Sequence, residues 1–147
     1  ARYGCFHEEG FPRVPPPRDA REFALLATHG AALLALHNTV DLASLVAHWD
    51  SGVRWVGDEA SLVGPLRHDE SSRRLYVGRA GYFSGFTPEL AGFRVGSYRP
   101  AFKWLRDREG RPLDAATRDA YLGVLAAMNR TRALCEIIDA VVCSREP

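Results

Sequence analysis

Apolar residues recur at the helical period in two long segments of the chain. The first segment is preceded by Asp19 and Glu22, which have the spacing of a capping box, so a long helix is predicted to begin there. The second follows Asp114, and its apolar stripe, which includes Tyr121 and Leu125, predicts a last helix of about 28 residues. Both ends of the chain are therefore expected to be helical.

The pattern between these helices is typical of strands. Four short runs of β-branched and aromatic residues each end at a glycine: VRWVG (53–57), RLYVG (74–78), GYFSG (81–85) and GFRVG (92–96). This punctuation predicts short strands joined by turns, and hence a small, largely antiparallel sheet around residues 53–97. The polar segment 66–74, LRHDESSRR, is expected to be an exposed loop between two of them.

One short helix completes the prediction. It should open after Pro100, a favourable residue for a first helical turn, and close at Gly110. Two long helices, a short helix and a small sheet make an α+β fold. We expect residues 1–18 to be an extended, Pro-rich lead-in and residues 19–147 to form a single domain.

Charge is distributed unevenly along the chain. The formal net charge is only +1, from 19 Lys and Arg against 18 Asp and Glu. Residues 67–111, however, hold ten cations and five anions, a net of +5. A basic middle segment between acidic ends predicts a surface that faces an anionic partner.

Other features bear on the compartment. The three cysteines give no disulfide framework, and Cys135 and Cys143 are too far apart on one helix to be bridged. No uninterrupted apolar run is long enough to span a membrane, and the N-terminal residues lack a signal pattern. We expect a cytoplasmic protein with no membrane partner. The chain lacks an initiator Met, which is typical of a piece of a longer protein.

Signatures of catalysis are missing from the sequence. It has no glycine-rich phosphate loop, no G-x-S-x-G motif and no CxxC pair. His29 and His37 lie two turns apart on one helix and cannot share a metal. Lys103 has no upstream acid at the Glu-x-Lys spacing of many nucleases. The chain is therefore predicted to have no catalytic site, no metal and no cofactor.

The run GSYRPAFKWLRDREGR, residues 96–111, combines five cations with three aromatic residues. At 100° per residue, Arg99, Lys103 and Arg106 fall within about 60° of each other on one helical stripe. The aromatic residues should face the core, and Arg108, on the buried side, should pair with a carboxylate or a carbonyl. The stripe and Arg111 remain free for an anion, although a solvated helix face would give the same pattern.

The same run carries a resemblance to a known family. Its K-W-L-x-x-R-x-G-R pattern, residues 103–111, follows a G-S-Y turn and precedes a long helix ending near Glu136 and Asp139. This arrangement resembles the C-terminal end of type ISP restriction–modification enzymes and related adenine-specific DNA methyltransferases. The upstream FPRVP segment also looks like that family, so the resemblance extends from about Phe11 to Val142.

The resemblance implies a target-recognition domain that reads double-stranded DNA. Such a domain positions a methyltransferase domain in the same or an associated chain, and the N-P-P-Y methyltransferase motif is absent here. A pattern shared among proteins that read different sites suits phosphate anchoring, whereas base readout suits the segment 66–74. The predicted DNA-binding residues are Arg67, His68, Arg73, Arg74, Arg99, Lys103, Arg106 and Arg111.

Two other functions remain open at the level of sequence. A protein-interaction domain could keep this fold without reading DNA, and its last helix would then present an exposed apolar stripe to a partner. A standalone regulator could bind DNA in competition with such a methyltransferase. Binding through apolar contacts would be insensitive to salt, whereas DNA binding through phosphates would weaken steeply with salt.

Overall fold

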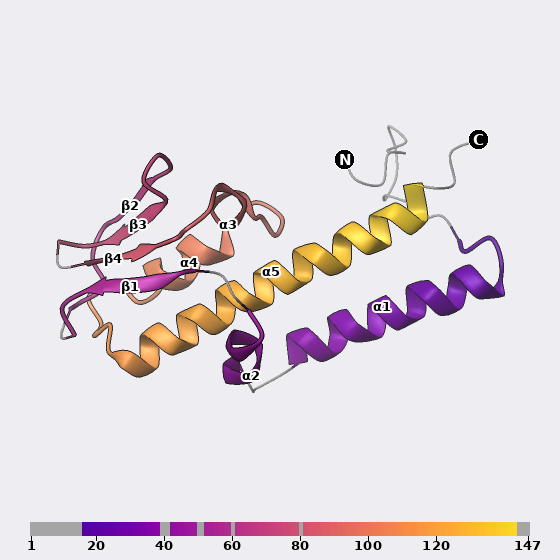
Figure 1. Ribbon diagram of the computed structural model, residues 1–147, viewed down its shortest axis with the longest axis horizontal. Helices are drawn as coiled ribbons and strands as arrows, with labels where there is room; N and C mark the ends of the chain where they lie inside the picture. Colours follow the sequence, from indigo (N-terminus) through magenta and orange to yellow (C-terminus); the bar gives the residue numbers. More distant parts are fainter. Residues whose placement is uncertain (1–15, 39–41, 50–51, 60, 80, 144–147) are drawn as a thin grey trace. The chain divides into compact units, whose positions relative to one another are not determined.

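The computed structural model describes residues 16–38, 42–49, 52–59, 61–79 and 81–143 (Figure 1). The elements, in chain order, are α1 (Ala20–Asn38), α2 (Leu42–Ala47), β1 (Arg54–Gly57), β2 (Leu66–Asp69), β3 (Arg74–Val77), β4 (Gly81–Ser84), α3 (Pro88–Gly92), α4 (Pro100–Arg106) and α5 (Ala115–Cys143). This combination of a sheet and helices confirms the predicted α+β class. Most of the predicted Pro-rich lead-in lies outside the described residues.

The chain divides into two compact units. One, which we call the helical unit, comprises Ala1–Asn38 with Thr131–Pro147, and the other, the sheet unit, comprises Thr39–Arg130. Helix α5 contributes its first part to the sheet unit and its last part to the helical unit. The two units are described separately below.

In the helical unit, the predicted cap of α1 by Asp19 is confirmed, while the Glu22 carboxylate accepts from the backbone N–H of Arg18. The Asp19 carboxylate accepts a hydrogen bond from the backbone N–H of Glu22 at 2.8 Å, and the buried Glu22 side chain forms an ion pair with Arg18. Leu36 and Leu134 are buried in this unit. Two large apolar residues of α1, Phe23 and Leu34, are 63% and 65% exposed.

In the sheet unit, four antiparallel strands form one sheet in the order β1-β4-β3-β2 (Figure 1). The predicted strands at β1, β3 and β4 are confirmed. The expected loop at 66–74 is wrong, because its first four residues form edge strand β2. Leu66 and His68 lie on the core side of β2, and Arg67 and Asp69 lie on its outer side. Because His68 is polar, the sequence does not show this alternation as one of apolar and polar residues.

The expected strand at 92–96 is also wrong. Pro88 occupies the first turn of α3, and the Thr87 hydroxyl caps it by accepting from the backbone N–H of Leu90 at 3.4 Å, so a helix forms just before this segment. Beyond α3, only an isolated bridge between Val95 and Tyr98 remains. The glycines and aromatic residue that indicated a strand here belong to a helix end and a turn.

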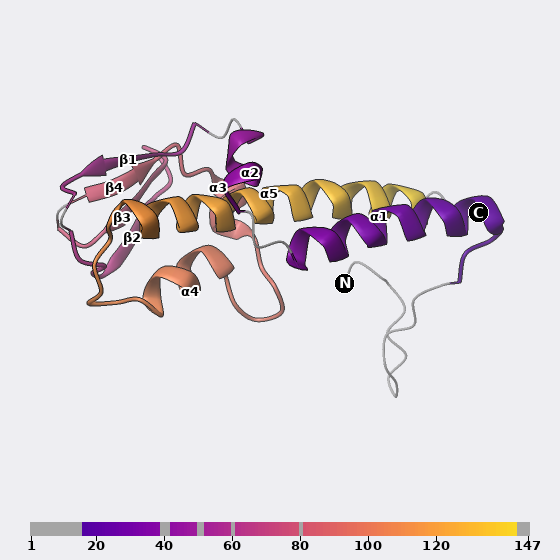
Figure 2. The ribbon, with the colours of Figure 1, turned by 90° about the horizontal axis from the view of Figure 1, so that it is seen from below.

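Helices α4 and α5 begin where predicted. Pro100 starts α4, which ends at Arg106 rather than reaching Gly110. The Asp114 carboxylate accepts from the backbone N–H of Thr117 at 2.8 Å and caps α5. Their apolar residues pack with those of the sheet in one core, and Figure 2 shows α4 alongside the first part of α5.

Aromatic side chains form the centre of the sheet-unit core. The ring of Tyr121 on α5 lies 4.8 Å from that of Phe83 on β4 and 5.4 Å from that of Trp104 on α4, centroid to centroid. Its hydroxyl donates to the Ala101 carbonyl at 3.2 Å. The largest fully buried side chains are Tyr121, Phe83, Phe86, Leu75, Leu105, Leu113, Leu125, Val53, Val63 and Val77.

Substitution of Gly85, directly after β4, should test its close approach to the backbone of Gly52. Gly85 has φ +70, and a Cβ added there would lie 2.5 Å from the backbone oxygen of Gly52. We expect Gly85→Ala to lower the free energy of unfolding by about 2 kcal/mol or more, measured by urea denaturation. Gly92→Ala is the matched control, since its Cβ would meet nothing within 4 Å. Equal stability of the two variants would contradict the described turn.

Candidate nucleic-acid interface

A pocket of about 390 Å³ lies against the exposed side of α4, and we call it the cationic pocket. Its lining residues are Arg94, Ser97, Tyr98, Arg99, Lys103, Arg106 and Asp107. Four of these seven side chains are cationic and one is anionic. The pocket therefore brings together the three stripe residues that the sequence predicted, Arg99, Lys103 and Arg106, and adds Arg94, which the sequence analysis did not single out.

Local geometry explains how the pocket forms. Gly96 has φ +58, which allows the chain to turn back so that Val95 and Tyr98 pair through their backbones. Pro100 then starts α4, whose inner side is buried by Ala101, Phe102 and Leu105. The opposite side of this helix is left exposed beside the turn, and the cationic stripe lies there.

Lys103 is already paired within the pocket. Its Nζ lies 2.9 Å and 2.8 Å from the two carboxylate oxygens of Asp107, one helical turn away. Both side chains are about half exposed, so the pair contributes little to stability. Arg94, Arg99 and Arg106 form no salt bridge within the described part of the chain. An incoming anion would meet these three cations first and would compete with Asp107 for the fourth.

Trp104, Arg108 and Gly110 of the K-W-L-x-x-R-x-G-R run have structural roles. The Arg108 guanidinium lies 3.6 Å from the Trp104 ring and donates to the Trp104 carbonyl at 3.0 Å, which confirms the predicted carbonyl partner. Gly110 has φ +77, and its N–H donates to the Val63 carbonyl at 2.8 Å. Tyr98, expected to hold the helix in place with Trp104, is instead 46% exposed at the pocket.

Arg111 lies just beyond this turn. Its backbone carbonyl accepts from the N–H of Val63 at 2.9 Å, and its side chain is exposed. It is not among the residues that line the cationic pocket. The backbone of Arg111 thus anchors the segment to the core, while its guanidinium faces solvent.

A second set of polar side chains occupies the outer side of the sheet, and we call it the sheet face. Strand register places Arg67, Tyr76, Tyr82 and Val56 in one row across the four strands. The neighbouring row on the same side is Asp69, Arg74, Ser84 and Arg54. The core aromatic residues lie on the other side, so this side carries three cations, one anion and two tyrosines.

The tyrosines of the sheet face hold two of its arginines. The Arg67 Cζ lies 4.0 Å from the centroid of the Tyr76 ring, and the Arg74 Cζ lies 4.6 Å from that of Tyr82. The two rings are 5.3 Å apart, centroid to centroid. Hydrogen bonds from Arg74 and, to a lesser extent, Arg67 lower the pKa of the Tyr76 hydroxyl.

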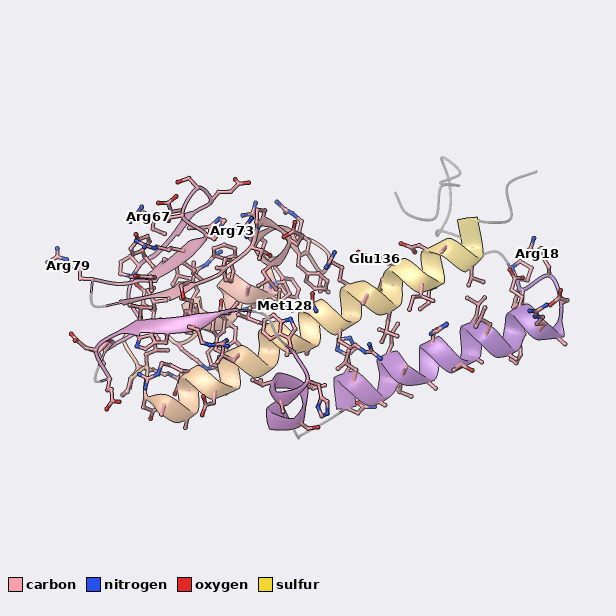
Figure 3. The ribbon with its side chains drawn as sticks, viewed as in Figure 1. Arg18, Arg67, Arg73, Arg79, Met128 and Glu136 are labelled. Atoms are coloured by element: carbon pink, nitrogen blue, oxygen red, sulfur yellow. The ribbon has the colours of Figure 1, made fainter. Side chains whose placement is uncertain are left out.

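His68 and Arg73 occupy different places from these arginines. His68 lies on the core side of β2, with its ring centroid 5.4 Å from that of Phe86 and 6.3 Å from that of Phe102. Its buried Nε2 has no hydrogen-bond partner among the described residues. Arg73 is exposed in the β2–β3 turn with φ 50, and Figure 3 labels it in the sheet unit together with Arg67 and Arg79.

The chain that carries these two surfaces can be compared with known protein families. The family model of the type ISP C-terminal specificity domain matches residues 1–136. The chain belongs to that family. Membership supports a target-recognition role in a restriction enzyme, as the resemblance implied. No curated protein and no solved structure matches the chain.

The described residues of this domain hold neither a metal-binding cluster nor a membrane-spanning helix. The described residues contain no group of three or more His, Cys, Asp or Glu side chains able to hold a metal. No described helix is long and apolar enough to cross a membrane. Sequence reasoning found the stripe on α4 but missed Arg94, Tyr76 and Tyr82. The alternation within RLYV and GYFS was the signal that could have placed the tyrosines on an outer face.

The turn between β2 and β3 gives a pH-dependent test of the sheet face. Hydrogen bonds from the side chain of Ser71 and from Ser72 lower the pKa of Asp69 to about 2. Because the folded pKa is depressed, the stabilisation from these bonds should be complete above about pH 4 and lost as the pH falls through 2. NMR titration of the Asp69 carboxyl should give a midpoint near 2, and Ser71→Ala should raise it. A normal midpoint in the unaltered chain would contradict this geometry.

Proposed function

We propose that this chain is the DNA-reading domain of a restriction–modification enzyme, with no catalytic site of its own. It binds double-stranded DNA and positions a methyltransferase domain of the same or an associated chain on the target. The observation that carries the proposal is the cationic pocket, where Arg94, Arg99 and Arg106 converge beside Lys103. Family membership supplies the context of target recognition.

The chemistry of the pocket suits a backbone phosphate. Guanidinium groups donate pairs of parallel hydrogen bonds that match the oxygens of a phosphate, and the pocket has three of them. Its lining also offers the hydroxyls of Ser97 and Tyr98 as further donors. Phosphate contacts fix the position of a protein on the duplex without carrying sequence information. The pocket is therefore assigned to anchoring, together with the exposed Arg111.

The absence of a catalytic role is supported by the nature of the polar residues. Among the described acids, Asp114 caps α5, Asp69 accepts hydrogen bonds in the β2–β3 turn and Asp107 forms a surface ion pair with Lys103. The cationic groups on both surfaces are arginines and one lysine, which bind anions but supply no nucleophile or metal ligand here. Methylation is thus assigned to another domain.

A protein-interaction function is the second candidate, and one observation favours it. Phe23 and Leu34 on α1 are both more than 60% exposed. The apolar stripe of α5 gives this function less support than expected, because Tyr121, Leu125, Met128 and Leu134 are all buried. Contact of α1 with another domain is compatible with DNA reading by the sheet unit.

The salt dependence of DNA binding should reveal the pocket. For a duplex oligonucleotide, Arg99→Ala and Arg106→Ala should each reduce the slope of log affinity against log salt by about 0.9. The loss should be similar for all duplex sequences, because phosphates carry no base information. Fluorescence anisotropy at several salt concentrations measures both quantities. Arg21→Ala, an exposed arginine of α1, is the charge-matched control and should leave the slope unchanged.

The same titrations can contradict the proposal. If the unaltered chain binds no duplex even at low salt, the DNA-reading function fails. If Arg21→Ala changes the slope as much as Arg99→Ala does, binding reflects net charge and the pocket has no special role. Salt-insensitive capture of a protein partner that Phe23→Ser abolishes would favour the second candidate instead.

Removal of the Asp107 carboxylate, which competes with DNA phosphates for Lys103, should strengthen DNA binding. Asp107→Asn eliminates the carboxylate that pairs with Lys103 and leaves the ammonium free for a phosphate. We expect affinity for duplex DNA at low salt to rise about three- to tenfold, with a salt slope steeper by about 0.9. Asp119→Asn changes the net charge equally at an exposed position of α5 and controls for long-range attraction. An equal gain in the two variants would show that Asp107 does not restrain the pocket.

A further inference from the structure

The sheet face presents two guanidinium groups that each lie over a tyrosine ring. Arg67 and Arg74 come from adjacent strands, and each has its Cζ within 5 Å of a tyrosine ring centroid. The side chains of Arg74, Tyr76 and Tyr82 are half-buried, whereas that of Arg67 is exposed. A side chain that already rests on a ring loses less conformational freedom when it binds a ligand.

Tyr76 is the centre of this arrangement. It lies opposite Arg67 on β2 and Tyr82 on β4, and Arg74 lies two residues before it on β3. Both guanidinium groups also interact with its hydroxyl, which explains why the pKa of Tyr76 is lowered. Tyr82 completes the set by contacting Arg74. Two rings thus hold two cations, and neither ring contributes to the buried core.

The two arginines form no direct ion pair within the described part of the chain, although the pKa of Arg74 is raised by its hydrogen bond to Tyr76 and, to a lesser extent, by the charge of Asp69, the residue opposite it. Neither Arg67 nor Arg74 forms a salt bridge within the described ranges. Asp69, which shares the sheet face, accepts hydrogen bonds from the Ser71 hydroxyl at 2.7 Å and from the backbone N–H groups of Ser71 and Ser72. Arg54, the third cation of this face, donates to the Val53 carbonyl at 2.9 Å.

The shape of these groups selects among anionic and polar ligands. A guanidinium has five N–H donors in one plane, so one that rests on a ring and donates to the Tyr76 hydroxyl still has donors left to form a fork toward a ligand. That fork matches the O6 and N7 acceptors of guanine in the major groove, which is wide enough to admit strands. A phosphate would also accept from it, but would not need the orientation that the rings impose.

Resting on the proposed DNA-reading function, we propose that the sheet face reads guanine in the major groove of the target. Arg67 and Arg74 donate to the base edges. Tyr76 and Tyr82 are positioning residues that determine specificity by holding the two guanidinium groups flat. The cationic pocket anchors the backbone, so anchoring and base reading are divided between two surfaces of the sheet unit.

The experiment begins with the full 147-residue chain and a library of random-sequence duplexes. Duplexes retained by the chain define its preferred site, and affinity for this site relative to an unrelated duplex gives a specificity ratio. Replacing individual guanines by 7-deazaguanine removes the N7 acceptor and should lower the ratio about tenfold or more at the bases that are read. Inosine keeps O6 and N7 and is the matched control, which should leave the ratio unchanged.

Variants then assign the roles. Arg67→Lys and Arg74→Lys keep the charge but lose the fork, so each should lower the specificity ratio about tenfold while affinity for the unrelated duplex stays within about twofold. Tyr76→Leu and Tyr82→Leu should lower the ratio similarly. Tyr76→Phe keeps the ring and should retain most of the ratio. Urea unfolding of each variant verifies that the sheet unit remains folded.

The outcomes separate this inference from the function on which it rests. If binding is strong and salt-dependent but the lysine and leucine variants leave the ratio unchanged, the guanine assignment is overturned and the DNA-reading function stands. If Arg67→Ala weakens binding to all duplexes equally, the sheet face contacts phosphates and the assignment is again overturned. Failure of the unaltered chain to bind any duplex would overturn both.

Discussion

The buried contacts of Tyr121 hold the sheet unit together. Its ring touches Phe83 of the sheet and Trp104 of α4, and its hydroxyl donates to the Ala101 carbonyl, so a single side chain of α5 connects three elements. Burial raises the pKa of this hydroxyl well above its usual range, and the phenol stays protonated as a donor. The paired hydroxyl avoids the cost of an unsatisfied polar group inside the core. Because this contact fixes which side of α4 faces inward, it also determines that the cationic stripe faces outward.

The core leaves two separate surfaces for charge. Aromatic residues fill the space between the sheet and the helices. Arginines of α4 and of the segment before it therefore lie at the cationic pocket, and arginines of β2 and β3 lie on the sheet face. These surfaces differ in how their cations are held. Pocket residues converge on a concave volume and share one acidic neighbour, whereas sheet-face arginines lie on rings. The first arrangement suits a ligand recognised by charge, and the second suits a ligand recognised by the direction of its acceptors.

Local signals in the sequence were sufficient for α1, α4 and α5, and insufficient for α2, α3 and part of the sheet. Caps at Asp19 and Asp114 and a sustained period of 3.6 placed α1 and α5, because helix formation depends on neighbours within one or two turns. Strand β2 was missed because His68, a core residue, reads as polar. The stripe on α4 followed from rotation about a single helix. The pairing of Arg67 with Tyr76 did not, since it requires the register between two strands, which no single segment encodes.

The alternation of β2 has a consequence for how such a domain can change its target over evolution. Adjacent residues Arg67 and His68 face opposite sides of the sheet, one toward solvent and one toward Phe86 and Phe102. Insertion or deletion of one residue within this strand would exchange them, burying a guanidinium and expelling an imidazole from the core. On the proposal that the sheet face reads bases, new specificities can arise there by substitution at fixed positions, and changes in length are better tolerated in the turn between β2 and β3. Related domains should therefore differ on the sheet face in the identity of their side chains and not in the length of their strands.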